Sequence, residues 1–93
     1  MAINNLNIAR QYVDSNGKPL SGGKVHFYEN GSFSIPQTAY TGTDIPAANP
    51  TILDSSGNCP QIFGTSGSYY NVLVTDSGGT VVLTYTALHV PLV

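Results

Sequence analysis

The sequence predicts an all-β fold, a small β-sandwich of six to seven short, mainly antiparallel strands. Turn-forming residues recur along the whole chain, which holds 10 Gly and 6 Pro in 93 residues. The stretches between the turns are rich in Val, Ile, Tyr, Phe and Thr, whose branched or flat side chains pack well on a pleated strand. No stretch predicts a helix. Short strands, frequent turns and a long central connection favour a sandwich over a closed barrel.

The expected strands follow from the positions of the turns. In the expected second strand, residues 24–29, Val25 and Phe27 alternate with His26 and Tyr28, which predicts one buried face. A polar connection with two prolines, residues 42–50, is expected to cross between the sheets. In chain order, the strands are expected at residues 6–13, 24–29, 37–41, 51–53, 61–63, 68–75 and 80–86.

The core is expected to form from the apolar positions that alternate along these strands. The single cysteine, Cys59, cannot form an internal disulfide, and it lacks Cys or His neighbours at zinc-ligand spacing. We therefore expect it to pack as a small apolar side chain. The expected core residues are Val25, Phe27, Ile52, Val72, Val74 and Val82.

An Asp-Ser-x-Gly pattern occurs three times, beginning at Asp14, Asp54 and Asp76. An Asp side chain can accept hydrogen bonds from backbone N–H groups just after it, and Gly readily takes the positive φ that many turns require. The unequal intervals of 40 and 22 residues give no internal repeat. The aspartates are therefore expected to stabilise turns, rather than to form a catalytic carboxylate pair or a calcium-binding loop.

The charge composition excludes several classes of partner. Charged residues make up 9% of the chain, against about 25% in a usual globular domain. The only strong bases are Arg10, Lys18 and Lys24, and the net charge is −2, so we expect no nucleic-acid partner. The apolar runs are too short for a membrane span. Residues 1–5 lack the regions of a signal peptide, and we therefore expect synthesis in a cytoplasm.

Side chains that could carry chemistry are few. A hydrolase needs a nucleophile, a base and an orienting group, but His26 lies on the polar face of a strand and His89 lies near the C-terminus. We expect no enzymatic activity, catalytic residue, metal or cofactor. The tyrosines are expected to serve as cross-strand packing partners and interface anchors, or alternatively to stack on sugar rings. They are Tyr12, Tyr28, Tyr40, Tyr69, Tyr70 and Tyr85.

Both ends of the chain are more apolar than free tails usually are. Residues 1–87 are expected to form one β-sandwich domain with an N-terminal segment, and residues 88–93 an apolar C-terminal arm. Pro91 lacks an N–H group, so the last residues cannot continue an ordinary central strand. The expected partner-binding residues are Ile3, Leu6, Leu88, Val90, Leu92 and Val93.

Four segments, taken in order, carry a family resemblance: QYVDSNGKPLSGGKVHFY (11–28), TAYT (38–41), NPTILDSSG (49–57) and GSYYNVLVTDSGG (67–79). Together they resemble an N-terminal-type β-sandwich module of bacteriophage tail fibres and tailspikes. The segment 35–37 and the loop 45–47 depart from the family pattern, so the contacts of those loops are not carried over.

The resemblance implies a virion structural protein without enzymatic activity. It implies an attachment or spacer module that docks onto other virion proteins, in the tail or capsid, as part of a homo-oligomer such as a trimer. Such a protein is made in the cytoplasm of the bacterial host and becomes part of the virion. Two alternatives stay open: a capsid decoration or head-fibre protein, and a module that binds a host glycan.

Overall fold

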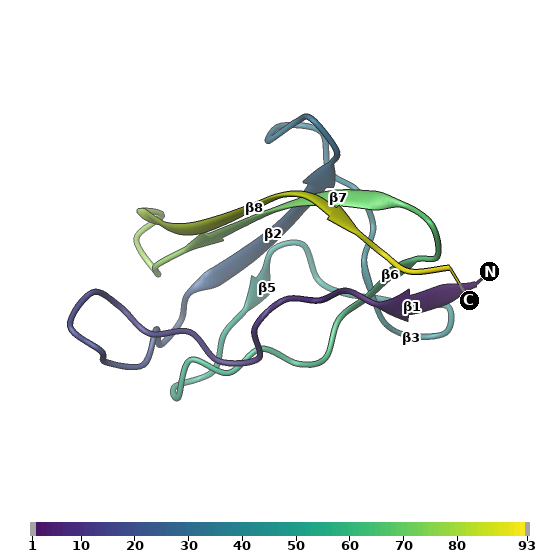
Figure 1. Cartoon of the computed structure of the whole chain (residues 1–93). Helices are drawn as coiled ribbons and strands as arrows, with labels where there is room; N and C mark the ends of the chain where they lie inside the picture. Colours follow the sequence, from purple (N-terminus) through teal and green to yellow (C-terminus); the bar gives the residue numbers. More distant parts are fainter. Residues whose placement is uncertain (1, 93) are drawn as a thin grey trace.

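Two four-stranded antiparallel sheets pack face to face in the computed structural model, which describes residues 2–92 (Figure 1). One sheet has the strand order β1-β6-β3-β4 and the other β5-β2-β7-β8. The described residues contain no helix, so the expected all-β sandwich is confirmed, with eight strands instead of six or seven. The strands are β1 (Ile3–Asn5), β2 (Lys24–Glu29), β3 (Tyr40–Gly42), β4 (Ile45–Pro46), β5 (Thr51–Ile52), β6 (Phe63–Thr65), β7 (Tyr69–Thr75) and β8 (Val81–His89).

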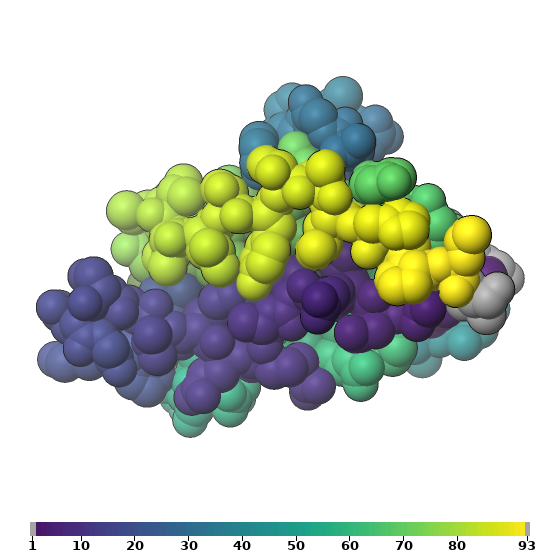
Figure 2. Space-filling model, viewed as in Figure 1, coloured from purple at the N-terminus to yellow at the C-terminus, as the bar shows by residue number. Residues whose placement is uncertain are grey.

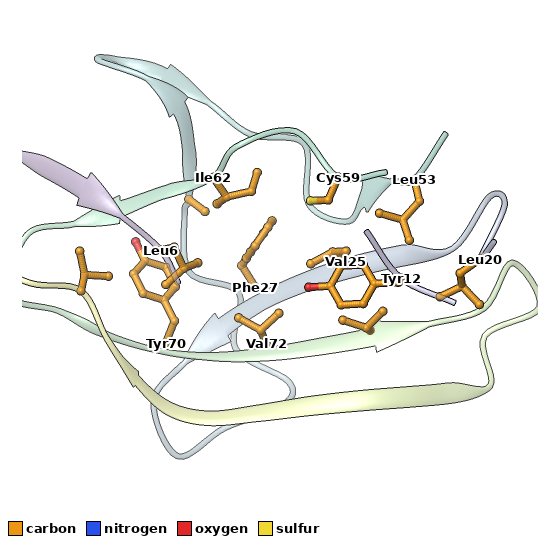
Figure 3. Close-up of a cluster of buried hydrophobic side chains, with 13 residues drawn as sticks. Leu6, Tyr12, Leu20, Val25, Phe27, Leu53, Cys59, Ile62, Tyr70 and Val72 are labelled. Atoms are coloured by element: carbon orange, nitrogen blue, oxygen red, sulfur yellow. The ribbon is translucent and has the colours of Figure 1, made fainter. Parts of the chain in front are cut away.

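Strands β2 and β7 supply the centre of the core. Val25 pairs with Val74 and Phe27 pairs with Val72, which places all four side chains on the face that meets the other sheet. Each of the four is 0% exposed. The alternation in the sequence therefore predicted these core residues correctly, and Figure 3 shows Val25, Phe27 and Val72 in the buried cluster.

Two expected core residues, Ile52 and Val82, are instead 55% and 40% exposed. Ile52 pairs with Lys24, whereas its neighbour Leu53 is only 2% exposed. Because strand side chains alternate between faces, the register turns Ile52 outward and Leu53 inward. Val82 lies where the pairing of β8 with β7 shifts register, in the outermost strand of its sheet.

The expected first strand at residues 6–13 is not formed. The strand at this end is β1, which precedes that segment, and residues 6–13 take part only in the isolated bridges of Gln11 with Asn58 and of Val13 with Pro19. The backbone N–H of Leu6 donates to the Ile62 carbonyl at 2.9 Å. A strand that the sequence did not predict, β4, interrupts the expected loop 42–50.

A buried tyrosine links the core to a loop and to strand β6. The Tyr70 hydroxyl donates to the Thr38 carbonyl at 2.6 Å and accepts from the Thr65 N–H at 3.0 Å. Cys59 is 2% exposed and belongs to the same core, as expected of a small apolar side chain. Burial raises the pKa of its thiol to about 11, with Arg10 acting in the opposite direction.

The three Asp-Ser-x-Gly turns have the same hydrogen-bond pattern. In each, Oδ1 of the aspartate accepts from the N–H groups two and four residues later, at distances between 2.8 and 3.0 Å. The glycines that close them have φ of 76° at Gly17, 74° at Gly57 and 92° at Gly79. The turn role expected of the aspartates is confirmed. All three turns lie toward the end of the sandwich opposite the chain termini (Figure 1).

Candidate interaction surface

Val90 belongs to the core of the domain and not to a separate arm. Strand β8 runs to His89, past the boundary expected after residue 87, and Val90 is 0% exposed. Its N–H donates to the Ser68 carbonyl at 2.8 Å, and its carbonyl accepts from Gly67 N–H at 2.9 Å. A Cβ at Gly64 would lie 2.5 Å from Val90 Cγ2, so this glycine makes room for the valine. The expectation that Val90 contacts a partner is wrong.

The other expected partner-binding residues fall into different environments. Leu6 is 1% exposed and lies in the core, so it is also unavailable to a partner. Ile3 pairs with Thr65 and is partly buried, and Leu88 packs against the core. Among the expected partner-binding residues that the structure describes, Leu92 is the one that projects into solvent, and it is 77% exposed. Val93 lies outside the described residues.

Strand β8 is a nine-residue strand at the outer edge of its sheet, and most of its residues are exposed (Figure 2). It contains no Asp, Glu, Lys or Arg, and Val81, Val82 and Leu83 are 56%, 40% and 40% exposed. Within residues 2–92, no strand pairs with its outer side. An edge strand presents backbone N–H and C=O groups that can pair with another chain. Strand β8 is therefore the best candidate for an interaction surface.

On the opposite side of the same sheet, short segments cover β2 piece by piece, and the edge strand there is the two-residue β5. Strand β5 pairs with β2 at Lys24 and Val25. Beyond that point, Asn49 Oδ1 accepts from Phe27 N–H at 3.0 Å, and Asn49 Nδ2 donates to the Phe27 carbonyl at 2.9 Å. Finally, Glu29 N–H donates to the Ile35 carbonyl at 2.8 Å. Among the described residues, the protein's own chain covers the β2 edge and leaves the β8 edge open.

Two irregularities limit the straight part of β8. The pairing shifts register between Val74 and Thr75 and again between Tyr70 and Val72, and Ala87 has a φ of 50°. Bulges of this kind bend an edge strand and restrict its pairing with other strands. The longest stretch of regular register therefore covers residues 83–85. A partner strand would need side-chain contacts beyond the backbone ladder to bind well.

A groove beside the start of β8 offers such contacts. It has a volume of about 410 Å³, and Val13 and Leu20 line it together with Val81 and Val82 of the strand. Asp14 and Asp76, from two of the three similar turns, also line it. Sequence reasoning missed this groove, because it joins segments more than fifty residues apart. The run Val81-Val82-Leu83 was the available signal, since three consecutive apolar residues in a strand cannot all face the core.

The tyrosines serve mainly in packing. Tyr12 and Tyr70 are 5% and 0% exposed, and the Tyr12 and Tyr85 hydroxyls lie 3.3 Å apart. Burial, followed by the hydrogen bond with Tyr85, raises the pKa of Tyr12. Only Tyr69 is exposed, with its ring 4.7 Å from that of His89. A platform of two exposed, coplanar tyrosines, which would have favoured sugar binding, is not formed by these six residues.

The remaining titratable groups do not converge on one site. His26 lies on the outer face of β2, stacked on Tyr28 at 6.0 Å between ring centroids. Partial burial, and then the charge of Lys24, lower the pKa of His26. In residues 2–92, no three His, Cys, Asp or Glu side chains are grouped so that they could hold a metal ion. No helix in this part of the chain is long and apolar enough to cross a membrane.

No family model matches the chain, and no curated protein matches it.

Proposed function

We propose that the chain is a non-enzymatic structural module of a bacteriophage virion, of the tail fibre or tailspike type, that docks onto another virion protein through strand β8. The observation that carries the proposal is the long, uncharged and open edge of β8, whereas the edge strand at the opposite side of the same sheet, β5, has only two residues. The order of the segments that resemble tail-fibre modules supports the placement in a virion.

The energetics of this edge favour a repeated assembly. Full burial of a Val or Leu side chain contributes about 1.5–3 kcal/mol. Because Val81, Val82 and Leu83 are about half exposed, covering them would contribute roughly 1 kcal/mol each. The costs of association and ordering offset much of this gain. One such contact is weak, but several copies held together by one assembly bind jointly with much higher avidity.

The placement in a virion can be tested on purified particles of the phage that encodes the chain. Mass spectrometry of gradient-purified particles should detect the chain, and antibody labelling seen by electron microscopy should locate it on the tail. Label on the head would favour the alternative of a capsid decoration or head-fibre protein. Absence of the chain from purified particles would contradict the proposal.

The role of β8 can be tested with a matched pair of substitutions. Val81 on β8 and Ile45 on β4 have nearly equal exposure, 56% and 57%, so Val81→Lys and Ile45→Lys each place one charge at an exposed apolar position. Val81→Lys should lower incorporation into particles, because the charge would lose water at the contact. Ile45→Lys should leave incorporation unchanged. Equal incorporation of both variants would show that β8 is not the docking edge.

A further inference from the structure

We infer that the groove beside β8 selects a partner strand that carries an apolar side chain and, two residues away, a lysine or arginine. This inference rests on the proposed docking at β8 and names the chemistry of the partner. Apolar side chains of Val13, Leu20, Val81 and Val82 line the groove, and two acidic residues, Asp14 and Asp76, form the part of its lining that we call its wall.

The backbone of such a partner would be extended, because it adds to the edge of β8. Strand addition supplies main-chain hydrogen bonds, while pockets for alternate side chains supply specificity. Side chains two residues apart in a strand point to the same face. One of them can therefore enter the apolar groove while the other reaches the carboxylates on its wall.

The two aspartates keep an oxygen that the turns do not use. The hydrogen bonds within the turns go to Oδ1 of Asp14 and Oδ1 of Asp76. Those bonds restrict each side chain through Oδ1, and each Oδ2 can accept a hydrogen bond from a cationic side chain. Lys18, which belongs to the same turn as Asp14, does not line the groove. The wall is thus acidic, and its charge complements a basic partner residue.

The third turn provides an internal control. Asp54 accepts the same two backbone hydrogen bonds, both at 2.9 Å, but does not line the groove. Asparagine keeps the Oδ1 acceptor that each turn needs while removing the charge. Asp14→Asn and Asp76→Asn therefore test the charge of the wall, and Asp54→Asn tests the effect of the same substitution elsewhere.

The experiment titrates the ¹⁵N-labelled full chain with capped heptapeptides and follows amide chemical shifts. The probe peptide is Thr-Ser-Val-Thr-Lys-Ser-Thr, and its partner has Glu in place of Lys. The Lys peptide should shift the amides of Val13, Val81 and Val82, and it should bind about twofold to tenfold more tightly than the Glu peptide. Salt at about 0.5 M should narrow this difference, because it screens exposed charges.

The three Asp→Asn variants test whether the preference for the Lys peptide arises at the groove. Asp14→Asn and Asp76→Asn should each reduce the ratio of the two affinities, and Asp54→Asn should leave it unchanged. A ratio that falls equally in all three variants would overturn the inference, because net charge alone would then explain the preference.

Three further results would overturn the inference in distinguishable ways. Equal binding of the Lys and Glu peptides at β8 would refute the charge preference and leave the proposed docking edge standing. Shifts of the β8 amides that depend on protein concentration without peptide would show that a second copy of the chain covers the edge. If neither peptide shifts any amide of β8, both the inference and the proposed docking edge fail.

Discussion

Replacement of Val90 by alanine tests whether the C-terminal residues belong to the domain. The side chain is 0% exposed and packs into the space that Gly64 leaves. Val90→Ala removes two methylene-sized groups at about 0.8 kcal/mol each, and the space left behind adds a further cost. We expect a loss of about 2–3 kcal/mol, which is a large part of the 5–15 kcal/mol that keeps a typical domain folded.

The measurement is urea and thermal unfolding followed by circular dichroism and tyrosine fluorescence. For a domain of this size, a loss of 2–3 kcal/mol lowers the Tm by roughly 10–20 °C. Leu92→Ala is the control, since Leu92 lies two residues further along the chain and is 77% exposed. It should change the stability by less than about 0.5 kcal/mol. If Val90→Ala were as mild as Leu92→Ala, Val90 would not be a core residue.

Two further predictions concern the core. Phe27→Ala should cost about 3–5 kcal/mol and leave the domain largely unfolded, because Phe27 is 0% exposed and pairs with Val72; a near-normal denaturation midpoint would refute the assigned facing of β2. Burial raises the pKa of Cys59 from 9.0 to about 11, so its protonated form is favoured in the folded state. The stability due to this group should be complete below pH 9.0 and lost as the pH rises through about 11. Thermal unfolding across this window should show a smaller loss for Cys59→Ala than for the wild type, and equal losses would contradict the assignment.

The local features of the fold were determined by the sequence itself. Each Asp-Ser-x-Gly turn forms through hydrogen bonds within five consecutive residues, so nothing distant was needed to predict it. The buried faces of β2 and β7 likewise followed from alternation, because a strand with one buried face must repeat every two residues. Those two signals were sufficient for the all-β class and for four of the expected core residues.

The tertiary structure alone decided which strand lies at an edge and which way Ile52, Val82 and Val90 face. Ile52 and Leu53 are adjacent and similar in chemistry, and only the register with β2 turns one outward and the other inward. Val90 and Leu92 resemble each other in the sequence, but the backbone hydrogen bonds with residues 67 and 68 direct Val90 into the core. The openness of β8 depends on the strand order of its sheet, which joins the β7–β8 hairpin to β2 and β5 from much earlier in the chain. Register and strand order are set by contacts between distant segments, and a pattern within a single segment does not encode them.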